Sequence, residues 1–318
     1  MSEMRAARYD RYGPPEVLYE GTLPKPVAGP REVLVRVHAT SVNGGELLGR
    51  AGKLKLVTGR KFPQGTGIDI AGEVAEVGSS VSHLAMGDRV WGATPRGTFG
   101  AAAEYVAVRP RQLSFAPDGI DLVRAAALPG VGTTAITALR DKIGLRSGER
   151  LLVRGAAGGV GSVAVQLGHA LGAHVTALAG AGALDFVREL GADEAHDYRT
   201  TGPTALGPFD AVLDTVGTGL GAYRGLLSPG GRMVSIAFAD RPLSSLGSIL
   251  VSTLHGSRRV RAFSGNPTHE LFADLAAYVE KGAIRPVIDT VHPLSGVGEA
   301  HRAMEAGGVR GKHVIQVV

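Results

Sequence analysis

The stretch that most limits the possible folds of this chain is Gly155–Leu184, thirty consecutive residues without Asp, Glu, Lys or Arg. A membrane-spanning helix needs about 20 predominantly apolar residues in a single helical pattern. This stretch instead contains many glycines and two histidines, His169 and His174, and its pattern changes from helix to strand along its length. We therefore exclude a membrane span and place the stretch in a globular domain.

Strands and helices alternate through this part of the chain. Apolar spacing predicts the following elements: strands at 151–156, 174–179, 194–198, 209–217 and 230–238, and helices at 124–144, 161–172, 183–191 and 270–282. Such alternation is typical of right-handed βαβ units around a parallel sheet. Short β-branched segments at 33–41, 67–78, 88–94 and 105–110 precede it and predict a β-barrel or sandwich. The last strand, 313–318, is expected to rejoin that first domain.

A glycine-rich loop, GAAGGVG at 155–161, lies between the first strand and the first helix of the alternating part. A dinucleotide-binding loop needs a tight turn, a bare backbone under the pyrophosphate, and a small residue where helix meets strand. Gly158 and Gly161 fit the second and third roles, and Ala156 stands in place of the first glycine. The loop predicts nucleotide binding at a helix N-terminus, with a purely structural turn as the alternative.

The end of the second strand bears on the choice of cofactor. NAD-binding units carry Asp or Glu there to bind the ribose hydroxyls, whereas Ala177–Ala181 contains no acid. Because a carboxylate would repel a 2′-phosphate, its absence favours NADPH over NADH. No Lys or Arg lies nearby in the sequence to bind that phosphate.

Composition excludes several kinds of site. The chain has no cysteine, which excludes disulfides, Cys-ligated zinc, iron–sulfur clusters and a Cys nucleophile. The ten histidines show no metal-ligand spacing. The net charge is +5, and its densest basic group, Arg258, Arg259 and Arg261, is a solvated loop or else a site for an anion or nucleic acid. The polar N-terminus lacks the apolar core of a signal peptide, so we expect a cytoplasmic protein.

Several segments carry a family resemblance that runs nearly from end to end: SVNGGELLGRAG (41–52), GIDIAGEVAEVG (67–78), LPGVGTTAITAL (128–139), VRGAAGGVGSVAVQLGHALGA (153–173), LGADEAHDYR (190–199), FDAVLDTVG (209–217) and GKHVIQVV (311–318). With them the chain resembles the zinc-independent medium-chain dehydrogenases/reductases, in particular the NADPH:quinone oxidoreductase (zeta-crystallin-like) group. The resemblance implies a GroES-like β-barrel catalytic domain at 1–122 and 267–318. It also implies a Rossmann domain, with a doubly wound parallel sheet, at 123–266.

The same resemblance assigns site residues. Asn43, Glu46 and Arg50 are the candidate catalytic residues. The candidate cofactor-binding residues are Asn43, Thr133, Ala157, Gly158, Gly159, Val160, Tyr198, Phe238, Phe263 and Lys312. For Glu46 a structural role is the alternative, and for Lys312 a solvent-facing position. No metal site is expected, because the zinc ligands of zinc-dependent relatives are matched here by Ser41–Asn43 and Ile68-Asp69.

Two departures from the family pattern affect the expected reaction. Ala183 replaces a basic residue that often holds the 2′-phosphate, and Leu48 replaces a Tyr considered as a proton donor, so we expect protonation from water. The resemblance implies an NADPH-dependent reductase of quinones or α,β-unsaturated carbonyls. The alternative is a cofactor-binding structural or RNA-associated protein with little turnover. We expect a homodimer formed through an edge strand, with GRMVSIAF at 231–238 as the candidate contact, and no membrane or nucleic-acid partner.

Overall fold

The structure is a computed structural model that describes residues 2–59, 61–236, 259–263 and 265–318. Chain contacts divide it into two compact units, which we call the catalytic unit (Met1–Thr133, Asn266–Gly282 and Pro286–Val318) and the nucleotide unit (Thr134–Gly265 and Ala283–Arg285). The domain limits expected from the sequence, 122/123 and 266/267, stay a prediction. Helix α3 (Leu122–Ala125) spans the expected limit at 122/123, and it contacts strands β3 and β5 of the catalytic unit.

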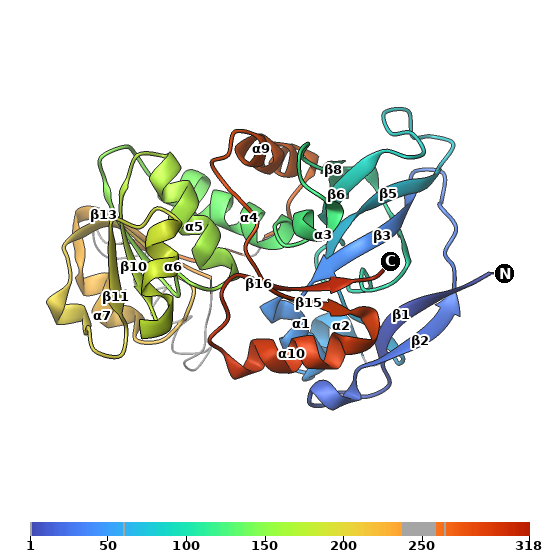
Figure 1. Cartoon of the computed structure of the whole chain (residues 1–318), viewed down its shortest axis with the longest axis horizontal. Helices are drawn as coiled ribbons and strands as arrows, with labels where there is room; N and C mark the ends of the chain where they lie inside the picture. Colours follow the sequence, from blue (N-terminus) through green and yellow to red (C-terminus); the bar gives the residue numbers. More distant parts are fainter. Residues whose placement is uncertain (1, 60, 237–258, 264) are drawn as a thin grey trace. The chain divides into compact units, whose positions relative to one another are not determined.

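The catalytic unit is built on two sheets (Figure 1). The larger has the order β15-β16-β3-β5-β6-β8, with β7 also paired to β3, and the smaller has the order β2-β1-β4. Their strands are β1 (Glu3–Tyr9), β2 (Tyr19–Pro24), β3 (Val33–Ser41), β4 (Gln64–Gly65), β5 (Asp69–Val77), β6 (Arg89–Ala93), β7 (Tyr105–Val108), β8 (Leu113–Phe115), β15 (Ile288–Pro293) and β16 (Lys312–Gln316). The helices are α1 (Gly44–Arg50), α2 (Lys55–Thr58), α3, α9 (His269–Glu280) and α10 (Val297–Ala306).

Strand β3 is central in its sheet and is buried along most of its length. Val33, Val35 and Val37 are fully buried and pack in the apolar clusters of the unit. The terminal strand β16 pairs antiparallel with β3, with Val314 opposite Ser41. The expectation that the C-terminal strand rejoins the first domain is therefore confirmed, and this pairing brings Lys312 close to the end of β3.

The nucleotide unit contains a six-stranded parallel sheet in the order β11-β10-β9-β12-β13-β14. Its elements are β9 (Arg150–Arg154), α5 (Gly159–Ala170), β10 (His174–Ala179), α6 (Leu184–Glu189), β11 (Glu194–Asp197), β12 (Phe209–Asp214), α7 (Leu220–Gly225), β13 (Leu227–Ser235) and β14 (Arg259–Arg261). This is the order of a doubly wound sheet, as expected. From β9 the successive strands are added first on one side, as β10 and β11, and then on the other side, as β12, β13 and β14, so the switch point lies between β9 and β12. Ligands of such sheets bind beyond the carboxyl ends of the strands at this switch point.

Two sequence-based expectations need correction. Residues 124–144 form three pieces: the end of α3, then α4 (Pro129–Ile136) and, directly after it, a π-helical segment Thr137–Ile143. The break between α3 and α4 falls before Pro129, which lacks the N–H that a continuous helix needs. Strand β13 is not an edge, since β12 and β14 pair with its two sides. The part of the candidate contact that lies in β13 is thus unsuited to a dimer contact through a free strand edge, residues 237–238 lie outside the described residues, and the expected homodimer stays a prediction.

A buried histidine in α10 predicts acid sensitivity of the fold. His301 is fully buried, neither ring nitrogen has a hydrogen-bond partner among the described residues, and burial lowers its pKa to about 3. The unfolded chain binds a proton at this histidine below about pH 6.5 and the folded chain does not, so stability falls as pH falls from 6.5 towards 3.

We expect that His301→Leu removes part of this acid sensitivity. At pH 5 the wild type should lose about 2 kcal/mol of unfolding free energy through this histidine relative to pH 8, and the variant should not. Urea unfolding at both pH values measures the difference. Equal pH dependence in the two proteins would contradict the assignment.

Candidate functional site

The glycine loop of the nucleotide unit turns at a different residue from the one expected. Gly155, directly after β9, has φ of +71°, and a Cβ there would lie 2.3 Å from Thr215 Oγ1. Ala156 is buried, and its N–H donates to the Leu178 carbonyl of β10. The tight-turn role therefore belongs to Gly155, and the expectation that Ala156 takes it is wrong. Only glycine combines this left-handed backbone with the close approach of Thr215.

The start of α5 offers backbone to a ligand. A Cβ on Gly161 would lie 2.1 Å from the Gly155 carbonyl oxygen, so this glycine allows helix and loop to touch. A Cβ on Gly158, the N-cap, would meet only that same oxygen, at 3.5 Å. The first turn of α5 contains no acidic residue, and its first N–H groups have no acceptor within the helix. Such a bare helix N-terminus fits a pyrophosphate.

A basic side chain lies at the end of β10, although the sequence suggested none nearby. One terminal nitrogen of Arg199 lies 3.3 Å from where a Cβ of Gly180 would stand. The guanidinium lies over the ring of Tyr198, 4.8 Å from its centre, and both side chains are exposed. Arg199 follows β11, which pairs parallel with β10, so the sheet brings it to Gly180 from 19 positions along the chain. The motif LGADEAHDYR already contained this residue.

A buried ion pair at the switch point was missed by sequence reasoning. Arg154 ends β9 and Asp214 ends β12, and their side chains meet at 2.5 Å with 7% and 0% of their surface exposed. The other Asp214 oxygen accepts from Gly217 N–H at 2.9 Å and Ser235 Oγ at 2.7 Å. The pair thereby fixes the turn after β12, whose Thr215 contacts the glycine loop. The sequence did contain a signal for this pair, because a basic and an acidic residue end two strands that were expected in the same parallel sheet.

The catalytic unit contains a closed polar cluster, which we define as Ser41, Asn43, Glu46, Thr66, Asp69 and Lys312. Asn43 Nδ2 donates to Asp69 at 2.8 Å and to Glu46 at 3.0 Å, and Asn43 Oδ1 accepts from Lys312 Nζ at 2.7 Å. Glu46 also accepts from Thr66 Oγ1 and Gly67 N–H, both at 2.9 Å. Three of the predicted site residues, Asn43, Glu46 and Lys312, are thus brought together.

Charges in this cluster are almost completely removed from solvent. Glu46, Asp69 and Lys312 expose 2%, 0% and 4% of their surfaces. Burial raises the pKa of Glu46 to about 7, to which Asp69 adds, while Asn43, Lys312 and Thr66 oppose the change. Burial lowers the pKa of Lys312, and the two carboxylates oppose that change. The solvent-facing alternative for Lys312 is therefore wrong.

The remaining predicted residues lie elsewhere. Arg50 is buried, donates to the Gly13 carbonyl and forms an ion pair with Glu305, without a hydrogen bond to the polar cluster. Thr133 donates to the Pro129 carbonyl within α4 at 2.6 Å. Phe263 is half-buried in the nucleotide unit, whereas Phe238 and Arg258 lie outside the described residues. All these assignments stay predictions.

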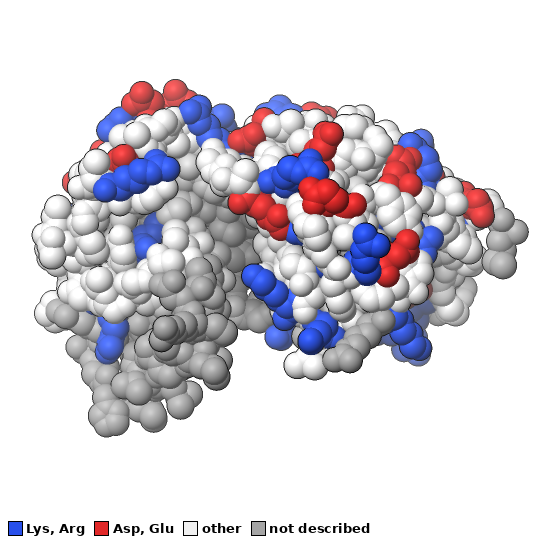
Figure 2. Space-filling model, turned by 90° about the horizontal axis from the view of Figure 1, so that it is seen from below, with Lys and Arg blue, Asp and Glu red and all other residues white. Residues whose placement is uncertain are grey.

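Metal and membrane features can be stated for the described residues. Within them no group of three or more His, Asp or Glu side chains is arranged to hold a metal ion. No helix in the described part of the chain is both long and apolar enough to cross a bilayer. Zinc independence and a cytoplasmic location stay predictions. On the face shown in Figure 2, acidic side chains lie among the basic ones, as on a solvated surface.

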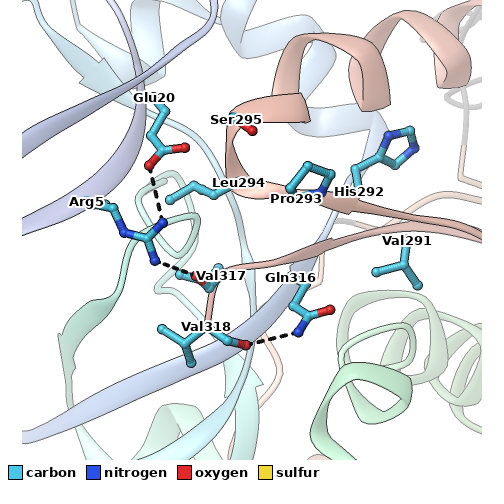
Figure 3. A pocket seen from close by; sticks show the side chains of 10 residues that line it. All are labelled: Arg5, Glu20, Val291, His292, Pro293, Leu294, Ser295, Gln316, Val317 and Val318. Carbon is cyan, nitrogen blue, oxygen red and sulfur yellow. Dashed lines mark hydrogen bonds and ion pairs between the residues drawn. The ribbon is translucent and has the colours of Figure 1, made fainter.

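A hollow of about 460 Å³ in the catalytic unit is lined by Arg5, Glu20, Gln316 and the segments 291–295 and 317–318 (Figure 3). Arg5 is already bound to Glu104, Glu20 and the Val317 carbonyl. No residue of the polar cluster lines this hollow.

Two family models match the chain: "Alcohol dehydrogenase GroES-like domain" over residues 29–118 and "Zinc-binding dehydrogenase" over residues 190–315. The first confirms the GroES-like nature of the catalytic unit. The chain is 34% identical to the human mitochondrial NAD(P)H oxidoreductase RTN4IP1, over 97% of this chain and 88% of that protein. It is 36% identical to tomato 2-methylene-furan-3-one reductase, over 100% of this chain and 80% of that protein.

Among solved structures, the quinone oxidoreductase from Coxiella burnetii superposes with a TM-score of 0.92 at 30% identity, over the full length of both chains. Relatives aligned over almost the whole chain agree with the fold and with both family models. This chain is an oxidoreductase and belongs to the quinone oxidoreductase family of the medium-chain dehydrogenases/reductases.

Proposed function

We propose that this protein is an NADPH-dependent oxidoreductase that transfers a hydride to a quinone or an α,β-unsaturated carbonyl compound without zinc. The observation that carries the proposal is the bare-backbone turn Gly155–Gly161 at the N-terminus of α5, at the switch point of a doubly wound sheet. The names of the relatives, an NAD(P)H oxidoreductase and an enone reductase, support the same class of reaction.

The nucleotide unit would hold the cofactor, which supplies the hydride when bound. Ala157–Val160 would bind the pyrophosphate through backbone N–H groups, and Tyr198 would contact the adenosine end. The end of β10 supports NADPH rather than NADH, because it lacks a carboxylate and has the Arg199 guanidinium beside Gly180. Phe263 and Thr133 would contact the nicotinamide half.

The catalytic unit would contribute Asn43 to the reacting end. Within the described residues, the hydrogen bonds of the Asn43 amide and the Lys312 ammonium all go to groups of the catalytic unit, so neither is a ready acid. Together with Leu48 in place of the family's Tyr, this supports protonation of the reduced product by water, and Glu46 is the remaining acid of the polar cluster. Quinones and enones are acceptors that need no Lewis acid, in agreement with a chain that lacks the cysteine ligand of zinc-dependent relatives.

The function is tested with purified protein, NADPH and a panel of small quinones and enones, followed at the absorbance band of the reduced nicotinamide. Oxidation of NADPH that depends on the acceptor is the expected result. NADPH binding without turnover on the whole panel would favour the alternative, a cofactor-binding structural or RNA-associated protein. Displacement of NADPH by RNA would identify that alternative directly.

Arg199→Ala is expected to weaken NADPH binding about 10-fold and to change NADH binding less than about 2-fold, because only NADPH carries a phosphate for the guanidinium. Fluorescence titration with each cofactor measures both constants. Arg188→Ala is the matched control, since Arg188 is also exposed in the nucleotide unit and pairs with Asp185. Equal losses for the two cofactors would contradict the role of Arg199.

A further inference from the structure

The polar cluster holds more charge than an ordinary structural network requires. Three ionisable side chains from three segments meet in it without solvent: Glu46 from α1, Asp69 from β5 and Lys312 from β16. Buried ion groups are weak evidence for stability, because removing them from water costs about as much as their attraction returns. A role in the candidate functional site accounts for these three buried charges better than a contribution to stability does.

The charges hold the Asn43 amide in one orientation. Its Nδ2 faces the Asp69 and Glu46 carboxylates and the Ser41 carbonyl, at 2.8, 3.0 and 3.1 Å, while its Oδ1 faces the Lys312 ammonium at 2.7 Å. A flipped amide would direct its NH₂ at the ammonium and its carbonyl at two carboxylates. It would therefore lose every charge-assisted hydrogen bond it makes.

Asp69 and Lys312 are themselves held firmly. Asp69 Oδ1 accepts from Gly130 N–H at 2.7 Å, in the first turn of α4, and its Oδ2 accepts from Ser41 Oγ at 2.5 Å. Lys312 Nζ donates to the Val42 carbonyl at 2.6 Å and lies 3.8 Å from Asp69 Oδ2. The opposite charges of Asp69 and Lys312 attract each other, and Glu46 is the second carboxyl group beside them.

We propose that Asp69 and Lys312 act together as positioning residues that hold the Asn43 amide in its working orientation and couple it to the charge of Glu46. This inference rests on the proposed function, in which Asn43 contacts the reacting end of the cofactor. It assigns Lys312 to the support of Asn43 rather than to cofactor contact. It also gives Asp69 a role that the family resemblance did not.

The coupling predicts opposite effects of the two supporting charges on Glu46. Asp69 from β5 and Lys312 from β16 act on the pKa of Glu46, and Glu46 in turn raises the pKa of Tyr9 from β1. Asp69 raises the pKa of Glu46 and Lys312 lowers it. Asp69→Asn should therefore lower that pKa and Lys312→Met should raise it, whereas a change in packing alone has no reason to give opposite signs.

The first measurement is an infrared titration of the unliganded protein from about pH 5 to 9, which follows the carbonyl band of a protonated buried carboxyl group. We expect a midpoint near pH 7 in the wild type, since the pKa of Glu46 is about 7. The midpoint should be lower in Asp69→Asn and higher in Lys312→Met, and Glu46→Gln should lose the transition. Shifts of the same sign, or none, would overturn the coupling.

The second measurement is the pH profile of kcat/KM for the acceptor. Its Glu46-dependent limb should move in the same direction as the infrared midpoint in each variant. Loss of the Asn43 orientation should also lower kcat about 10- to 100-fold in Lys312→Met, with partial recovery in Lys312→Arg. An active Lys312→Met enzyme with the wild-type kcat and profile would overturn the positioning role.

Matched controls are Asp118→Asn and Lys281→Met, which make the same chemical changes at exposed positions of the catalytic unit. Neither should move the infrared midpoint or the pH profile. The two proposals fail separately: absence of turnover in the wild type would overturn the proposed function, while the infrared titration still decides whether Asp69 and Lys312 control Glu46.

Discussion

Gly161→Ala is expected to abolish cofactor binding at practical concentrations, with a loss of affinity of about 100-fold or more. The new Cβ would stand 2.1 Å from the Gly155 carbonyl oxygen and 2.7 Å from Ala156 Cα, and both are backbone atoms that cannot rotate away. Loop and helix must therefore separate, which removes the alignment of N–H groups at the start of α5. A 100-fold loss corresponds to about 2.7 kcal/mol of binding free energy.

The prediction is measured by isothermal titration with NADPH and by the rise in melting temperature that NADPH causes. Gly221→Ala is the control, because Gly221 lies in α7 of the same unit and a Cβ there meets nothing within 4 Å. The control should bind as the wild type does and should be at least as stable. A folded Gly161→Ala protein that still binds NADPH normally would show that the loop does not hold the pyrophosphate.

Local sequence pattern was enough to predict the parallel sheet of the nucleotide unit. Strand–helix alternation predicts the parallel sheet, and the glycine spacing predicts its ligand-binding end, because both depend on local pattern. Local pattern could not show that β13 is covered by β14, since pairing depends on a strand that enters the sheet late in the chain. The same limit explains the wrong assignment of the tight turn to Ala156, which required the position of Thr215.

The site residues likewise fall into those that a local motif identifies and those that only the pairing of strands brings in. Motif matching selected Asn43, Glu46 and Lys312 separately, and the structure places them in one cluster because β16 pairs with the end of β3. Motif matching did not identify Asp69 as the partner of these residues, because Asp69 comes from another strand, β5. For the same reason it did not identify Arg199 beside Gly180, because Arg199 follows β11. Which strands are neighbours in a sheet is not visible in any single segment, so these partners follow only from the fold.

The second large effect is expected at the switch point itself, where Asp214→Asn should lower the unfolding free energy by about 3–5 kcal/mol. The substitution keeps the shape of the side chain but leaves the Arg154 guanidinium buried without its counter-charge, with 7% of its surface exposed. Its remaining partners are the Thr218 carbonyl, the Thr218 hydroxyl and the Tyr223 ring, whose centre lies 3.6 Å from the guanidinium carbon. None of them is an anion.

Urea unfolding followed by circular dichroism measures the change, with Asp185→Asn as control. Asp185 pairs with Arg188 at 2.7 Å on the surface, with 93% and 48% of the side chains exposed, and such pairs contribute about 0–1 kcal/mol. Removing both charges in Asp214→Asn/Arg154→Met should recover part of the loss, because no uncompensated charge remains. If Asp214→Asn destabilises no more than Asp185→Asn, the pair does not hold the turn beside the glycine loop. The glycine loop Gly155–Gly161 would then keep its shape for cofactor binding without help from the ion pair.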